Sequence, residues 1–99
     1  MKLVFTEQAL TSFEETLEFI ATKLPHKKVL EIRNRILDRT DTLLLHPLIG
    51  QKEPFLEDLG LDHRRLVVDH CKVIYRVVGE YIYIIDIFDS RQDPDNMKG

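Results

Sequence analysis

The stretch KVIYRVVGEYIYIIDIFDSRQ, residues 72–92, decides the fold of this chain. Two runs rich in β-branched and aromatic residues, Lys72–Val78 and Tyr81–Phe88, flank the pair Gly79-Glu80. Such side chains favour a pleated surface, and glycine accepts the positive φ that a tight turn needs. The stretch therefore predicts a β-hairpin. An isolated hairpin is only marginally stable in water, so we expect a third strand and a helical cover elsewhere in the chain.

Two further strands are predicted before the hairpin. Arg64–Val68 precedes an expected turn at Asp69-His70-Cys71, and Lys2–Phe5 lies near the start of the chain. Three consecutive strands with short connections predict an antiparallel meander, which commonly buries one face against helices.

The residues after the first strand predict a helix from about Glu7 to Lys23. Thr6 suits the N-cap, because its hydroxyl can accept a hydrogen bond from an amide in the first turn. Pro25 stops the helix. Apolar side chains recur at steps of three and four residues and form one stripe. The stripe consists of Leu10, Phe13, Leu17, Ile20 and Leu24.

A second helix is predicted from near His26 to Leu45 or His46. Pro47 ends it, because the residue before a proline is pushed out of the α region. Its stripe consists of Val29, Ile32, Ile36, Thr40, Leu43 and Leu44. The short link between the helices predicts an antiparallel helical hairpin. The order β-αα-βββ then predicts an α+β fold, with the helical hairpin packed on a mostly antiparallel sheet.

Residues 47–63 lose this periodicity. Pro47, Gly50, Pro54 and Gly60 interrupt them, so we expect an irregular loop. Loops of this length in compact domains are often functional or mobile.

Composition narrows the classes of function. The 99 residues suit one domain, residues 1–99. A net charge of −3 argues against non-specific binding to nucleic-acid backbones. The single cysteine, Cys71, excludes an internal disulfide and any CxxC motif, which fits a cytoplasmic protein. No apolar run is long enough to span a bilayer, so we expect no membrane partner.

No nucleotide or metal motif is present. The four glycines match neither the dinucleotide-binding fingerprint nor the P-loop, and the four histidines lack the spacing of zinc ligands. The sequence therefore predicts no cofactor and no metal.

Basic side chains gather around the predicted hairpin. Lys72 and Arg76 share one side of their strand, because alternate residues project to the same face. Arg65 lies on the preceding strand and Arg91 just beyond the last, so a meander can bring them together on one face. Clustered cations can neutralise phosphate and stabilise charge in phosphoryl transfer. The alternative interpretation is ordinary solvated surface charge.

The three strands, followed by Arg91-Gln92-Asp93-Pro94 and preceded by a helical hairpin that ends in LLHPLIG (residues 44–50), resemble the RelE/ParE superfamily. These proteins, also described as plasmid stabilization proteins, are the toxins of type II toxin–antitoxin modules. The resemblance covers essentially the whole chain. It implies the fold predicted above, growth inhibition, and a cognate antitoxin that binds the toxin in a hetero-oligomer.

RelE-like members cleave mRNA on the ribosome without a metal. The resemblance places Arg65, Lys72 and Arg91 where those enzymes carry basic residues, which implies a catalytic set only if this chain is RelE-like. RelE-like enzymes also carry a tyrosine or histidine beyond the last arginine, and residues 92–99 contain neither. His63 and His70 would then be the possible proton carriers.

ParE-like members lack that set and act by binding DNA gyrase. An acidic chain without the catalytic tail fits them better. We therefore expect a ParE-like toxin that inhibits gyrase and is neutralised by its antitoxin, whose amphipathic helix or strand would occupy an apolar groove. A ribosome-dependent mRNA endoribonuclease is the alternative, and a degenerate toxin that retains only antitoxin binding is the third possibility.

Overall fold

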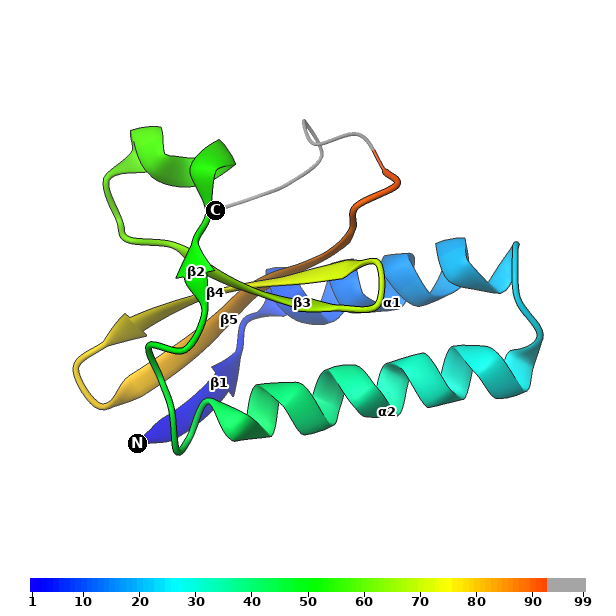
Figure 1. Ribbon diagram of the computed structural model, residues 1–99, viewed down its shortest axis with the longest axis horizontal. Coiled ribbons are helices and arrows are strands. Elements are labelled where there is room, and N and C mark those ends of the chain that lie inside the picture. Colours follow the sequence, from blue (N-terminus) through cyan, green and yellow to red (C-terminus); the bar gives the residue numbers. More distant parts are fainter. Residues whose placement is uncertain (93–99) are drawn as a thin grey trace.

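The computed structural model describes residues 1–92, which form two α-helices packed on a five-stranded mixed sheet (Figure 1). The elements are β1 (Lys2–Phe5), α1 (Glu7–Ala21), α2 (His26–Thr42), β2 (Gln51–Lys52), the 3₁₀ helix η1 (Pro54–Leu59), β3 (Arg64–Val68), β4 (Cys71–Val78) and β5 (Tyr81–Asp89). The strand order is β1-β5-β4-β3-β2, with β1 parallel to β5 and the other pairs antiparallel. The predicted α+β fold is confirmed.

The β4–β5 hairpin forms the centre of the sheet. Gly79 has a φ of 60°, as the predicted turn requires. A register shift between Ile74 and Tyr75 leaves one extra residue, Ile85, in β5. The turn before β4 was predicted one residue too long. Cys71 is the first residue of β4, because Asp69 adopts a φ of 54° and closes the turn early.

The main core lies between the helices and the sheet. Thr6 caps α1 as predicted and accepts from the amide of Ala9 at 3.0 Å. The predicted stripe of α1 is partly wrong, because Leu10 is 55% exposed while Thr16 is buried. Thr16 faces the sheet because its hydroxyl donates to the carbonyl of Ile87 at 2.8 Å. The residues that α1 and α2 bury are Ala9, Phe13, Thr16, Ile20, Val29, Ile32, Ile36 and Thr40.

Both helices end earlier than predicted. The C-cap of α1 is Thr22, and that of α2 is Leu43. Three turn hydrogen bonds, ending at the amide of His46, follow α2. Leu44 therefore leaves the helical stripe and is exposed. None of the helices in residues 1–92 is long and apolar enough to cross a membrane.

Residues 47–63 are not the irregular loop that the sequence predicts. They contain β2 and η1, and η1 stands on the side of the sheet opposite the helices (Figure 1). Leu56 of η1 packs with Ile74 and Phe88 in a second, smaller apolar cluster. The loop is ordered because the sheet supplies the apolar surface that Leu56 needs. We call residues 50–63 the strap.

Candidate functional site

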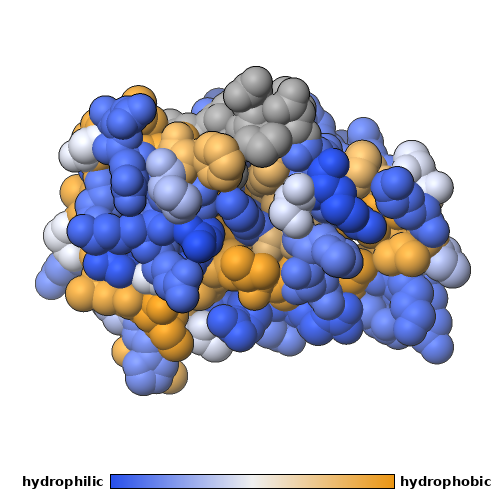
Figure 2. All heavy atoms as spheres, turned by 45° about the horizontal axis from the view of Figure 1, so that its top comes forward, coloured by the Kyte–Doolittle hydropathy of each residue, from blue (hydrophilic) through white to orange (hydrophobic). Residues whose placement is uncertain are grey.

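The face of the sheet opposite α1 and α2, called the outer face, carries the predicted basic cluster. In the strand register Arg65 lies opposite Ile74, and Val67 lies opposite Lys72. Arg76 follows on the same side of β4, opposite Tyr83. The strap covers the part around Ile74 and leaves the rest open. Figure 2 brings the top of Figure 1 forward and shows a largely hydrophilic surface with smaller hydrophobic areas between.

Arg65 and Lys72 flank one buried carboxylate, that of Glu53. The Lys72 ammonium lies 3.5 Å from Oε1 of Glu53, and Arg65 Nη1 lies 3.6 Å from Oε2. The Glu53 side chain is fully buried. A buried carboxylate costs several kcal/mol unless opposite charge accompanies it. The two cations therefore neutralise the charge that the strap inserts against the sheet.

Further contacts fix the same two cations. Arg65 donates to the carbonyl of Lys52 at 2.7 Å and to the side chain of Gln51 at 3.2 Å. The Lys72 ammonium lies 5.2 Å from the centre of the Phe55 ring, at cation–π distance. Both side chains are only about one-fifth exposed.

Arg91 has a different acidic partner from this pair. Its guanidinium forms a two-point interaction with Asp89, at 3.0 Å and 2.7 Å, and lies 5.8 Å from the ring of Phe19 in α1. Burial alone would raise the pKa of Asp89, but hydrogen bonds and charge from Arg91 outweigh it and lower that pKa. Arg91 therefore pairs with a different carboxylate from Arg65 and Lys72, and it contacts the helical layer through Phe19.

The two candidate proton carriers differ in their surroundings. His63 is 3% exposed, and neither of its ring nitrogens has a hydrogen-bond partner in the described residues. Burial and the nearby charge of Arg76 lower the pKa of His63, which favours a neutral ring. His70 is exposed in the turn between β3 and β4.

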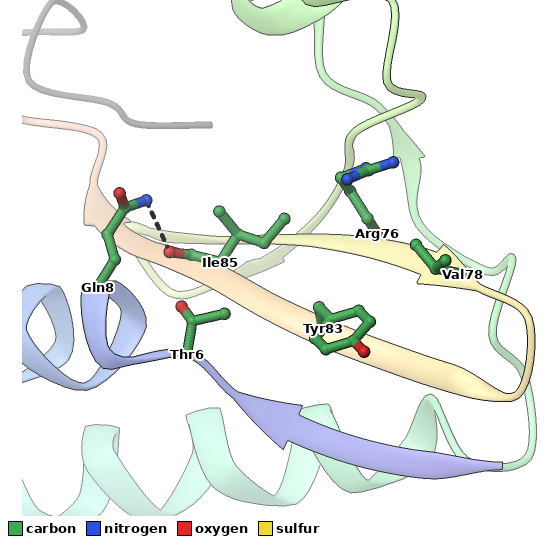
Figure 3. A pocket seen from close by; sticks show the side chains of 6 residues that line it. All are labelled: Thr6, Gln8, Arg76, Val78, Tyr83 and Ile85. Atoms are coloured by element: carbon green, nitrogen blue, oxygen red, sulfur yellow. Dashed lines mark hydrogen bonds between the residues drawn. The ribbon is translucent and has the colours of Figure 1, made fainter.

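Figure 3 shows a hollow in the open part of the outer face. Its volume is about 460 Å³, and its lining is Thr6, Gln8, Arg76, Val78, Tyr83 and Ile85. Arg76 is held at the rim, where it donates to the carbonyl of Leu61 at 2.8 Å. Tyr83 stacks on Tyr81 with ring centres 5.8 Å apart. The hollow therefore offers mainly apolar and aromatic surface with one cation beside it.

Two further kinds of site were considered in residues 1–92, a reactive thiol and a metal-binding cluster. Burial raises the pKa of the Cys71 thiol to about 12, so the thiol stays protonated at neutral pH. No cluster of His, Cys, Asp or Glu in these residues has metal-site geometry. The rest of the tail, residues 93–99, lies outside the described residues.

Sequence reasoning missed Glu53, the residue that engages two of the three predicted site cations. Its side chain accepts from the amide of Phe55 and so caps η1, with Pro54 as the first residue of that helix. An acidic residue directly before a proline is a helix-start signal, and it was the available clue.

Comparison with known proteins supports one family. A family model described as the ParE toxin of type II toxin-antitoxin system, parDE, matches residues 3–94. A solved structure described as the chromosomal ParDE TA system from P. aeruginosa has a similar fold, with a TM-score of 0.69 and 19% sequence identity. The match covers 90% of this chain and 95% of that one. No curated protein matches the chain.

Proposed function

Because the chain belongs to the ParE toxin family of type II toxin–antitoxin systems, we propose that it inhibits growth by binding DNA gyrase and that a cognate antitoxin neutralises it. Gyrase acts on chromosomal DNA, so the proposed place of action is the cytoplasm.

One observation favours gyrase over mRNA. Each cation that the RelE-like interpretation needs is engaged by a buried carboxylate, Arg65 and Lys72 by Glu53 and Arg91 by Asp89. A cation that stabilises a phosphate in a transition state must offer its donors to that phosphate. Here the acidic partners compete for those donors, and Arg91 shares its carboxylate with neither of the other two.

The open part of the outer face suits the proposed antitoxin. Tyr83, Val78 and Ile85 provide apolar surface around the hollow, and Arg76 provides a cation at its rim. An amphipathic segment with an acidic residue would match this combination. We therefore propose a toxin–antitoxin hetero-oligomer in which the antitoxin covers the open outer face.

The test is inducible expression in a bacterial host, with plasmid supercoiling and ribosome-bound mRNA followed in parallel. We expect supercoiling to fall while mRNA stays intact. The same purified chain should inhibit purified gyrase in a supercoiling assay. Cleaved mRNA with normal supercoiling would reject the proposal, and loss of that cleavage in Arg65→Ala and Lys72→Ala variants that still fold would support the RelE-like alternative.

A further inference from the structure

Four large aliphatic side chains gather in the exposed turns after α2. Leu44, Leu45, Leu48 and Ile49 are 41%, 80%, 60% and 56% exposed. We call these four residues the apolar knob. A shallow hollow of about 490 Å³ lies among residues 45–49. Exposed aliphatic residues are common singly, but a contiguous group of them marks an interaction site in a soluble protein.

The backbone under the knob is held firmly from behind. Arg64 donates to the carbonyl of Gly50 at 2.9 Å and reaches that of Leu48 at 3.5 Å. The amide of Gly50 donates to the hydroxyl of the buried Tyr75 at 2.9 Å. A Cβ at position 50 would lie 2.6 Å from the Tyr75 hydroxyl, so this close approach needs glycine. The knob is thus preorganised, which reduces the conformational entropy lost on binding.

The side of the knob toward β3 is basic. A hollow of about 220 Å³ lies there, and its lining includes Arg39, Ile49, Arg65 and Val67. Arg39 is exposed at the end of α2 and forms no ion pair within residues 1–92. A partner that carries carboxylates beside an apolar pocket would match both features.

We propose that the apolar knob is the surface that engages the protein target of the toxin, by inserting into an apolar pocket with an acidic rim. This inference rests on the proposed function and deepens it, because it separates the target-binding surface from the outer face assigned to the antitoxin. A second copy of the chain suits the knob less well, because a two-fold contact would bring both Arg39 side chains to one interface.

The test compares two purified full-length double variants in gyrase supercoiling assays. Leu45→Ser with Leu48→Ser removes two leucines of the knob. Leu10→Ser with Leu59→Ser is the control, because those leucines are similarly exposed, at 55% and 52%, on α1 and η1. Buried apolar anchors carry much of an interface's energy, so we expect the knob variant to need at least about tenfold more protein for half-inhibition. The control should match the wild type, and thermal unfolding should show that both variants fold.

Charge reversal supplies a second measurement. Arg39→Glu should weaken inhibition and remove much of its dependence on salt, because the complementary charge is lost. Inhibition by the knob variant at wild-type potency would overturn the inference and leave the proposed function standing. A wild-type chain without effect on gyrase would overturn both. Sedimentation that shows a wild-type dimer and a monomeric knob variant would overturn the inference by identifying a contact between copies.

Discussion

The Lys72 ammonium in β4 lies 3.5 Å from Oε1 of Glu53, a residue 19 positions earlier in the chain. This pair joins the strap to the centre of the sheet. Arg65 of β3 is the second cation beside this carboxylate, with its Nη1 3.6 Å from Oε2 of Glu53. Lys72 therefore has an acidic partner that its own strand does not reveal, because the strap supplies it.

The substitution Glu53→Gln should destabilise the protein. It keeps the shape of the side chain but leaves Arg65 and Lys72 without their counter-charge. Removing one partner of a buried pair costs about 3–5 kcal/mol when both are buried. Because both cations reach solvent, we expect a loss of roughly 2 kcal/mol in the free energy of unfolding, measured in urea.

Glu57→Gln, on the exposed side of the same 3₁₀ helix, is the matched control and should change stability by less than about 0.5 kcal/mol. Equal effects of the two substitutions would mean that the Glu53 carboxylate does not anchor the strap.

The elements that the sequence predicts well are those with strong local signals. Two β-rich runs around Gly79 are enough to predict the β4–β5 hairpin. The stripe of α1 is less predictable, because Thr16 is buried to satisfy the carbonyl of Ile87, 71 positions away. The predicted stripe of α1 contains only apolar residues, and a long-range hydrogen bond places a polar residue in the core here.

The candidate site was likewise predictable only in part. Sequence reasoning located Arg65, Lys72 and Arg91 correctly on or beside their strands. It could not give their electrostatic surroundings, because Glu53 comes from a segment without periodicity. That segment is ordered by a contact of Leu56 with the sheet, which no local pattern encodes.

Asp89 should make stability depend on pH in the acid range. Its pKa in the folded state is lowered from the ordinary value of 3.8, with Arg91 overcoming the opposite effect of burial. The folded carboxylate thus stabilises the protein above pH 3.8, and this contribution is lost as the pH falls through the folded pKa. We expect Asp89→Asn to be less stable than the wild type at neutral pH.

The difference between the two proteins should shrink as the pH is lowered below 3.8, when unfolding is followed by fluorescence or circular dichroism in urea. Asp58→Asn, an exposed aspartate of η1, is the control. A difference that stays constant down to about pH 2 would show that the Asp89 charge is not the source of the effect.

His63 should make stability depend on pH in a higher range than Asp89 does. Burial lowers its folded pKa below the ordinary value of 6.5, while an unfolded chain takes up a proton near that value. The unfolded state then binds more protons, so stability falls as the pH drops through 6.5 toward the folded pKa. His63→Leu removes this titration. Its free energy of unfolding should therefore vary less than that of the wild type between about pH 7.5 and about pH 5.

His70→Gln removes an exposed imidazole and is the matched histidine substitution. Parallel curves for the wild type and His63→Leu would contradict a neutral buried imidazole at position 63.

The contact between Tyr75 and Gly50 should matter for both stability and inhibition. Tyr75→Phe removes the hydroxyl that accepts from the buried amide of Gly50, and an unsatisfied buried donor costs about 1–3 kcal/mol. Tyr81→Phe is the control, because that side chain is 42% exposed. We expect urea unfolding to show a loss of about 1–2 kcal/mol for the first variant and almost none for the second.

Gyrase inhibition by folded Tyr75→Phe should also weaken, because the backbone beneath Leu48 and Ile49 loses one of its two anchors. Arg64 retains the other. A destabilised variant that inhibits with full potency would show that the knob needs no rigid support, whereas Tyr81→Phe should leave potency unchanged in either case.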